Sequence, residues 1–361
     1  MCIKIVSSQR KSRKIGAMEG ELKSFMKVFI SIMASLLYSY FIASKIPKGK
    51  FRFFSLLPIF SLFAVLPLSL STVFLTGTVT FFITWLTTYK LLLFSFNLGP
   101  LVSDPPLKFP LFASIACLPI KIKPKKTDPD HKNLKKIPNP KLPLNLPAKI
   151  VIFAGFIAAG DNIDRLRPNA KICVYSALLY FFVDILFGVP SVLFRLMFGG
   201  VELEPGSNEP YLMTSLQDFW GRRWNLLVSN SLRYSVYKPV RAAVEGLIGP
   251  TWAAGVAVMA VFVVSGVMHE QMVYYLTREF PTWETTWFLV VQGVCVVVES
   301  GLKATVGRRW RPPSVVAGLL TWAVLMVTAA WLFFPPFLKA GTFESLLREL
   351  KMVGKFLWKL I

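Results

Sequence analysis

His269 is the residue in this chain best suited to proton transfer. The sequence holds two histidines, and His269 lies in the apolar stretch VVSGVMHEQMVYYL. Between Trp252 and Leu276 its only charged neighbour is Glu270. An ionisable side chain inside a hydrophobic segment is costly unless a cavity or a polar partner accommodates it. The position therefore predicts a functional histidine, and the adjacent acid weighs against the alternative of a structural histidine bonded to a carbonyl.

The absence of other motifs narrows the chemistry. The sequence has no Gly-x-Ser-x-Gly nucleophile elbow and no glycine-rich phosphate loop. His131 is placed by its neighbours in a Lys- and Pro-rich segment, where a solvated loop histidine is the better interpretation. A lone base in an apolar span suits direct deprotonation of a hydroxyl that attacks an activated acyl donor, without a covalent enzyme intermediate.

A second polar stretch, SLQDFWGRRWNLLVSNSLRYSVYKPV, runs from Ser215 to Val240. If it is one helix, Asp218, Arg222, Asn225 and Ser229 share a narrow stripe. Asp218 and Arg222 are then four residues apart and are expected to pair. The stripe would present Asn225 to a cavity.

The same stretch is a candidate binding site for a polyanion. Its basic residues match what a phosphate-bearing thioester carrier requires. An interfacial helix with tryptophans and snorkelling arginines is an equally good interpretation of the composition. The predicted carrier-binding set is Arg222, Arg223, Trp224, Asp218, Arg233 and Lys238, with Arg241 nearby.

Asp184 and the cysteines favour structural roles. Asp184 lies in the apolar stretch LLYFFVDILFGVP, and we expect it to bond to a neighbouring helix or to an arginine such as Arg195. Four cysteines are scattered along the chain with no paired or metal-ligand spacing. We therefore predict neither a disulfide framework nor a metal site.

The elements that must position these residues are transmembrane helices. Of 361 residues, 54% are hydrophobic and the mean hydropathy is +0.55, which is more apolar surface than a soluble domain of this length can bury. Two shorter apolar segments, 111–120 and 150–159, are uncertain crossings. We predict an all-α polytopic bundle with about seven to nine spans, of which the stronger candidates are 25–43, 53–70, 73–94, 172–198, 252–276, 287–298 and 315–334.

Charge and composition divide the chain into segments. The net charge of +22 fits cytosolic loops and anionic lipid better than nucleic acid, because the apolar spans dominate. Met18 is an alternative start, downstream of a leader that does not have the pattern of a secretory signal. The expected segments are a basic leader at 1–17, N-terminal transmembrane helices at 18–120, a Pro-rich cytosolic loop at 121–149, a core at 150–342 and an amphipathic membrane-surface helix at 343–361.

Two motifs closely resemble the plant wax synthase group of the membrane-bound O-acyltransferase superfamily. They are NEPYLMTSLQDFWGRRWNLLVS, from Asn208 to Ser229, and VVSGVMHE, from Val263 to Glu270. The resemblance implies an endoplasmic-reticulum enzyme that transfers a fatty acyl group from acyl-CoA to a lipid hydroxyl. It also implies that His269 is the base, that Asn225 is its partner, and that acyl-CoA is a co-substrate with no further cofactor.

The acceptor stays open within this resemblance. A long-chain alcohol giving wax esters is the leading hypothesis, and sterols or diacylglycerol are the alternatives within the same chemistry. A non-enzymatic lipid transporter is a remote alternative, because no repeated halves are visible in the sequence. The sequence does not define the oligomeric state.

Overall fold

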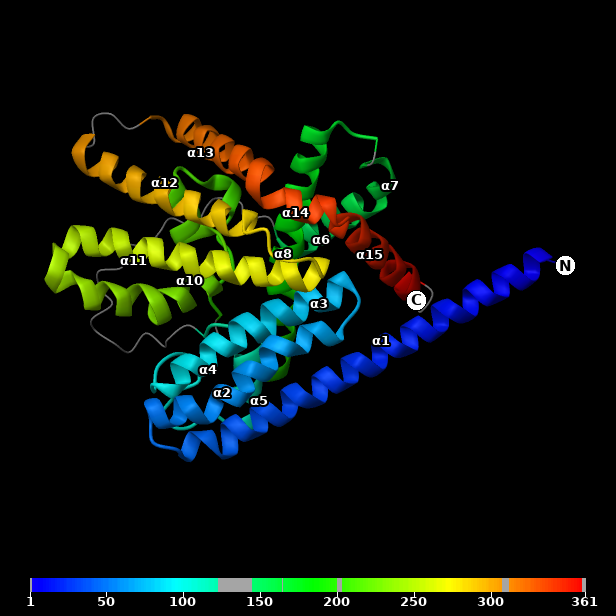
Figure 1. The fold of residues 1–361 in the computed structure, drawn as a ribbon, viewed down its shortest axis with the longest axis horizontal. Coiled ribbons are helices and arrows are strands. Elements are labelled where there is room, and N and C mark those ends of the chain that lie inside the picture. The colour runs from blue at the N-terminus through cyan, green and yellow to red at the C-terminus, as the bar shows by residue number, and fades with distance from the viewer. Residues whose placement is uncertain (1, 123–144, 164, 200–202, 307–311, 359–361) are drawn as a thin grey trace.

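The computed structural model shows a bundle of long helices (Figure 1). It describes residues 2–122, 145–163, 165–199, 203–306 and 312–358. Seven helices within these ranges are long and apolar enough to cross a membrane, and the described residues form no β-strand. The chain is therefore an all-α, polytopic integral membrane protein, as the sequence predicts.

The N-terminal part forms one group of helices, coloured blue to cyan in Figure 1. They surround a common core that includes Leu36, Phe63 and Leu91, all fully or almost fully buried. In chain order the helices are α1 (Cys2–Phe41), α2 (Lys50–Val65), α3 (Val73–Val79), a π-helical turn (Thr80–Thr87), α4 (Thr88–Ser95) and α5 (Phe109–Cys117).

The central and C-terminal helices complete the bundle. Long helices α8, α11 and α12 lie beside shorter segments that contain the motif around Asn225, and α11 itself contains the motif with His269. The α-helices in chain order are α6 (Leu146–Ala158), α7 (Gly160–Ile163), α8 (Pro168–Phe198), α9 (Leu216–Asp218), α10 (Leu226–Leu232), α11 (Lys238–Thr277), α12 (Glu284–Val306), α13 (Ser314–Thr328), α14 (Phe334–Lys339) and α15 (Thr342–Trp358). Three further π-helical turns occupy Phe219–Arg223, Arg233–Tyr237 and Ala329–Phe333.

The predicted spans agree closely with the structure. Each of the seven stronger candidates coincides with one of the seven apolar helices that are long enough to cross, and only 53–70 extends past its helix, by one residue. The two short segments form α5 and α6, which are 9 and 13 residues long. Both are shorter than the roughly 20 residues that a straight crossing requires.

The Pro-rich loop ends earlier than expected. Helix α6 begins at Leu146, with Asn145 accepting a hydrogen bond from the Ala148 N–H as its N-cap. Lys149, which we expected to end the loop, is therefore a buried helical residue. Residues 123–144, including His131, lie outside the described part of the chain. At the other end of the chain, residues 2–17 continue helix α1 instead of forming a separate element.

The span that contains His269 is one arm of a hairpin. Gly249 has φ 79° and ψ 163°, so the apparently continuous helix α11 is broken there. The residue before a proline is pushed out of the helical region, and Pro250 follows directly. In Figure 1 the arm before the break, which contains α10 and the first part of α11, lies beside the arm after it, which contains the rest of α11. The arm with His269 therefore starts at Pro250.

Helix α15 is amphipathic, as its pattern predicts, and the first part of its apolar face packs against protein. Phe343, Leu346 and Leu347 on its apolar face are buried and share a core with Phe334 and Val273. An amphipathic face packs equally well against protein or lipid, and here the protein supplies the apolar partner. The C-terminal helix is thus a wall of the bundle.

Candidate active site

The imidazole of His269 is held in one orientation by its own helix. Its Nδ1 lies 2.7 Å from the carbonyl oxygen of Ser265, one turn earlier on α11. A carbonyl only accepts, so Nδ1 carries the proton and donates it. Nε2 then keeps its lone pair and is free to act as a base.

Aromatic rings surround this imidazole. The ring of Trp85, from the π-helical turn 80–87, is centred 5.0 Å from that of His269. Phe333, from the π-helical turn 329–333, is centred 6.4 Å away on an edge-on approach. These two rings give the imidazole a largely apolar surrounding.

Glu270 does not assist His269, although the two are adjacent in the sequence. Its carboxylate accepts hydrogen bonds from the N–H groups of Trp283, at 2.7 Å, and Thr286, at 3.2 Å. Successive helical residues point about 100° apart, so Glu270 faces the start of α12 instead. It satisfies N–H groups that the beginning of that helix leaves free, which is a structural role.

Asn225 lies at a break in the helix that we predicted for 215–240. The backbone is extended at Trp224, and Asn225 itself is left-handed, with φ 40° and ψ 61°. The prediction of one stripe through Asp218, Arg222, Asn225 and Ser229 is therefore wrong. Asparagine tolerates this conformation because its short side chain bonds to the local backbone. Here its Oδ1 accepts from the Val228 N–H at 3.3 Å and caps α10, which leaves the Nδ2 amide to donate elsewhere.

A neighbouring segment fixes this break in place. The Leu226 N–H donates to the Gly206 carbonyl at 2.8 Å, and the Asn208 N–H donates to the Arg223 carbonyl at 2.9 Å. Residues on either side of Asn225 are thus both tied to 206–208. This double tie defines where the amide of Asn225 points.

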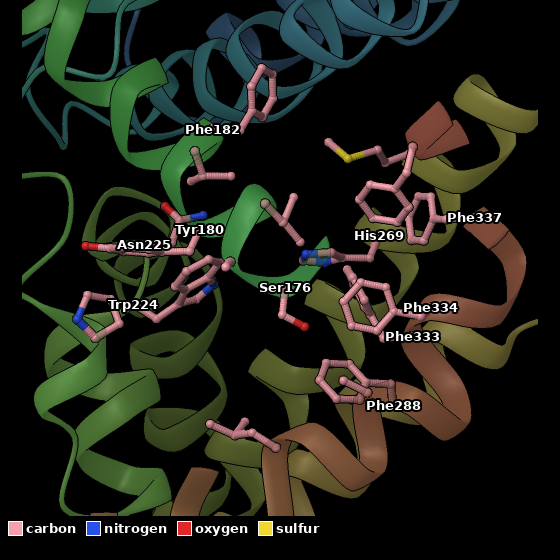
Figure 2. Close-up of a pocket in the computed structure, with 18 of the residues that line it drawn as sticks. Ser176, Tyr180, Phe182, Trp224, Asn225, His269, Phe288, Phe333, Phe334 and Phe337 are labelled. Atoms are coloured by element: carbon pink, nitrogen blue, oxygen red, sulfur yellow. The ribbon is translucent and has the colours of Figure 1, made fainter. Parts of the chain in front are cut away.

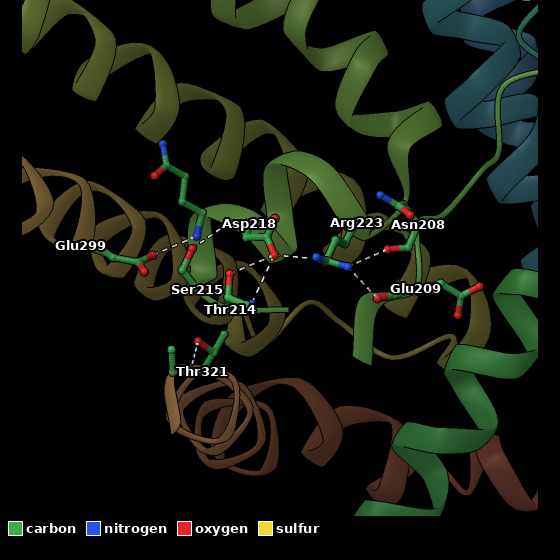
Figure 3. A network of polar contacts seen from close by, with 10 residues as sticks. Asn208, Glu209, Thr214, Ser215, Asp218, Arg223, Glu299 and Thr321 are labelled. Atoms are coloured by element: carbon green, nitrogen blue, oxygen red, sulfur yellow. Dashed lines mark hydrogen bonds and ion pairs between the residues drawn. The ribbon is translucent and has the colours of Figure 1, made fainter. Parts of the chain in front are cut away.

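Arg223, and not Arg222, is the partner of Asp218. Its Nε lies 2.5 Å from the Asp218 carboxylate, and its Nη1 donates to the carbonyls of Asn208 and Glu209 (Figure 3). The spacing of four residues expected for an Asp218 pair with Arg222 does not apply, because 219–223 is a π-helical turn. Arg223 therefore ties the turn before Asn225 to the segment that positions it.

His269 and Asn225 line the same cavity. Its volume is about 600 Å³, within the usual range for small-molecule sites. Figure 2 shows Asn225, Trp224 and Tyr180 on one side, and His269 with Phe333, Phe334 and Phe337 on the other. The wall is mostly apolar and aromatic, so the imidazole and the amide are among its few polar groups.

The predicted carrier-binding residues lie outside this cavity, apart from Trp224, which lines it. Arg222, Arg233 and Lys238 are exposed, and the Lys238 ammonium lies 4.1 Å from the centre of the Tyr234 ring. Asp218 and Arg223 are paired with each other. Arg241 lies 3.3 Å from Glu245, one turn along the same helix. The structure therefore separates Arg222, Arg233 and Lys238, which are accessible, from the pair that holds the fold.

Asp184 bonds to Lys149, which we expected to lie in the Pro-rich loop. Lys149 lies 2.7 Å from Asp184 and 3.4 Å from Glu209, and all three side chains are mostly buried. The Ser207 hydroxyl also donates to Asp184. The expected partner Arg195 is exposed and is not involved. This cluster links α6 and α8 to the segment before the Asn225 motif, as a structural role for Asp184 predicts.

Sequence reasoning missed the aromatic wall of the site. Trp85, Phe288 and Phe333 line the cavity, and they come from three separate parts of the chain. Each is one of many aromatic residues in an apolar segment, since the chain has 31 phenylalanines and 10 tryptophans. Nothing in their local pattern distinguishes them from residues that face lipid.

The half-buried imidazole of His269 and the half-buried amide of Asn225 thus line one cavity inside a polytopic helical bundle. Residues 203–291, which include both Asn225 and His269, match the sequence model of a protein family described as "Membrane bound O-acyl transferase family". The Arabidopsis thaliana protein named acyl-CoA–sterol O-acyltransferase 1 is 38% identical over 93% of this chain and 96% of its own length.

Two further relatives are named for fatty alcohols. The Simmondsia chinensis long-chain-alcohol O-fatty-acyltransferase is 40% identical over 90% of this chain and 92% of its own length. The probable long-chain-alcohol O-fatty-acyltransferase 3 of Arabidopsis thaliana is 41% identical over 94% and 96%. The chain therefore belongs to the membrane bound O-acyl transferase family, in its plant wax synthase group, and is an acyltransferase.

Proposed function

We propose that the chain makes wax esters at the endoplasmic reticulum membrane, by transferring a fatty acyl group from acyl-CoA to a long-chain alcohol. The observation that carries this proposal is that His269 and Asn225 line one cavity, with Nδ1 of the histidine already bonded to Ser265. Several of the relatives at about 40% identity are named for long-chain alcohols, which supports the choice of acceptor.

The proposed reaction is a single displacement. Nε2 of His269 takes the proton of the alcohol as its oxygen attacks the thioester carbonyl carbon. Negative charge then develops on the carbonyl oxygen, and the Nδ2 amide of Asn225 donates a hydrogen bond to it. The intermediate collapses by breaking the carbon–sulfur bond, and the thiolate of CoA takes the proton from His269. The imidazole is thereby restored to its starting state.

The proposed place for the CoA phosphates is the exposed basic group Arg222, Arg233 and Lys238. Arginine presents several N–H donors to a phosphate, and an exposed side chain can adapt to a flexible ligand. Arg223 is left out of this proposed group because its Nε and Nη1 already bond to Asp218 and to two carbonyls. CoA would then approach from outside while the acyl chain enters the cavity.

A sterol is the second candidate acceptor. It is favoured by the Arabidopsis thaliana relative named for sterols, which is as similar in identity and coverage as those named for alcohols. The chemistry at His269 and Asn225 would be unchanged, since a sterol also attacks through a hydroxyl.

Lipid products from a yeast strain without its own neutral-lipid acyltransferases test the acceptor. The strain would express this chain and receive fatty alcohols, sterols or diacylglycerol in separate cultures. We expect wax esters only in the cultures given fatty alcohol. Steryl esters or triacylglycerol in their place would contradict the choice of acceptor, and no ester from any of them would contradict the proposed activity.

A further inference from the structure

The cavity extends well away from the reacting groups. Its wall along α11 includes His269, Met272 and Leu276, and seven residues of helix span about 10 Å. A second wall runs alongside this part of α11. Its residue Trp85 lies against His269, and its residue Gly77 lies against Leu276. A Cβ placed on Gly77 would come within 3.7 Å of the Leu276 side chain. The space is therefore a channel that runs along α3 and α11.

Helix α15 stands at the end of the channel that is remote from His269. Phe343 and Leu346 line the cavity, and both belong to the apolar cluster that Leu276 and Val73 pack against. Phe343 and Leu346 are 5% and 7% exposed, so these side chains face the interior and not lipid. The channel thus runs from the imidazole to an apolar wall on α15.

Three contacts hold this wall in position. The Glu349 carboxylate accepts the N–H groups of Val73, at 2.9 Å, and Phe74, at 2.8 Å, at the start of α3. The Tyr175 hydroxyl of α8 donates to Glu344 at 2.9 Å. The rings of Tyr175 and Phe343 stack with centres 4.5 Å apart and planes 9° apart. Helix α15 is therefore fixed to α3 and to α8, and both of these helices contribute residues to the cavity wall.

We propose that the wall formed by Phe343 and Leu346 receives the methyl end of a substrate hydrocarbon chain and sets the chain length that the enzyme prefers. This inference rests on the proposed function, which places the reacting end of the chain at His269. An alkyl tail has no polar group to satisfy, so an apolar wall is the chemistry that recognises it. The distance from His269 to the wall then limits how many methylene groups fit.

Leu346→Ala tests the wall, and Leu347→Ala is its matched control. Leu347 is the next residue of α15 and is equally buried in the same cluster, but it does not line the cavity. We expect Leu346→Ala to favour chains about two methylene groups longer, and to raise the ratio of kcat/KM for the longer over the shorter chain by about 10-fold. Leu347→Ala should keep the wild-type preference.

Gly77→Leu tests the channel from the opposite direction. Gly77 lines the cavity between His269 and α15, and a leucine there would project into the channel beside Leu276. We expect this variant to favour chains shorter than those of the wild type. Shifts in opposite directions from Leu346→Ala and Gly77→Leu would show that both act by changing the space.

Two series of substrates identify the chain that reaches α15. One series varies the acyl-CoA with a fixed alcohol, and the other varies the alcohol with a fixed acyl-CoA. A shift in one series assigns the channel to that substrate. If neither preference changes in an active Leu346→Ala enzyme, or if Leu347→Ala shifts it equally, the proposal is wrong.

Photolabelling gives a result that does not depend on turnover. Acyl-CoA and alcohol probes of graded length, each with a diazirine at the terminal carbon, would be bound to the full-length protein in nanodiscs. We expect the probe of preferred length to label the α15 peptide that contains Phe343 and Leu346. Wild-type protein that forms no ester contradicts the proposed function. Absence of α15 labelling at every length overturns the inference about the wall.

Discussion

At the scale of single residues, His269 and Glu270 show what a sequence can and cannot assign. The apolar surroundings of His269 predict a functional imidazole, and the structure places it in a cavity. Its carboxylate neighbour looked like a partner, but it bonds to the start of α12. The direction of a side chain depends on tertiary contacts, which adjacency in the sequence does not show. Asn225 was predicted to face a cavity, and it lines one from a helix break that its pattern did not reveal.

Asn225→Asp separates the amide of this residue from its structural role. Aspartate keeps the oxygen that caps α10 and also tolerates a left-handed backbone. It loses the N–H donors and adds a negative charge beside the reacting carbonyl. We expect kcat to fall by about 10²- to 10³-fold with little change in the thermal unfolding midpoint. An Asn225→Asp enzyme with wild-type kcat would contradict a role for the amide.

Arg223→Ala and Arg222→Ala are expected to differ although the residues are adjacent. Removing Arg223 takes away the charged partner of Asp218 and one donor to each of two carbonyls, and leaves Asp218 only its bonds from Thr214, which costs about 2 kcal/mol of unfolding free energy. Arg222 is exposed, so its loss should leave stability unchanged and raise the KM for acyl-CoA. Thermal unfolding and acyl-CoA titration measure the two effects. Equal loss of stability in both variants would contradict this division.

At the scale of elements, the spans were predictable and their irregularities were not. Runs of about 20 apolar residues are visible in the sequence because lipid requires them. Three of the four described π-helical turns nevertheless contribute side chains to the cavity, through Trp85, Trp220 and Phe333. A π-helical turn shifts the faces of a helix and often occurs at functional sites. The hydrophobic pattern contains no signal for that extra residue, so the predicted stripe failed.

Gly249→Ala tests the hairpin that carries His269. Gly249 has φ 79° and ψ 163°, a backbone region that is almost restricted to glycine and that costs a residue with a side chain about 1–3 kcal/mol. We expect a lower thermal unfolding midpoint for this variant. Gly246→Ala is the control, since Gly246 lies in the helical arm and a Cβ there would meet no atom within 4 Å. Equal changes in the unfolding midpoint for Gly249→Ala and Gly246→Ala would contradict a specific requirement for glycine at the bend.

At the scale of the whole molecule, the sequence predicted the class of protein but did not predict which residues form the wall of the cavity. The hydropathy and the two motifs were sufficient for an all-α membrane acyltransferase. The cavity is assembled from segments between Val73 and Leu346, so its wall depends on long-range packing. Helix α15 was expected to lie on the membrane surface, but an amphipathic pattern does not specify whether the apolar face contacts lipid or protein. In the structure, protein covers much of that face. Lys149 is a second case in which the sequence pattern does not specify the partner: it was expected in a basic loop, and it is buried in α6 beside Asp184.

Two-substrate kinetics test the proposed single displacement. Cys173 and Ser176 of α8 line the cavity and are nucleophiles by type, but the Ser176 hydroxyl donates to the Ile172 carbonyl. Direct transfer predicts intersecting lines in double-reciprocal plots, and no acyl label on the protein when alcohol is omitted. Parallel lines with a labelled Cys173 or Ser176 would establish a covalent intermediate instead.

A double-mutant cycle on His269 and Asn225 tests the central claim most directly. It compares kcat/KM for ester formation by purified wild type, His269→Ala, Asn225→Asp and the double variant, at matched protein levels. Groups that serve one transition state have strongly non-additive effects. We predict that His269→Ala lowers kcat/KM by at least about 10²-fold. We also predict that kcat/KM of the double variant is no lower than that of the less active single variant. Wild-type activity in His269→Ala, or losses that simply multiply, would contradict the account.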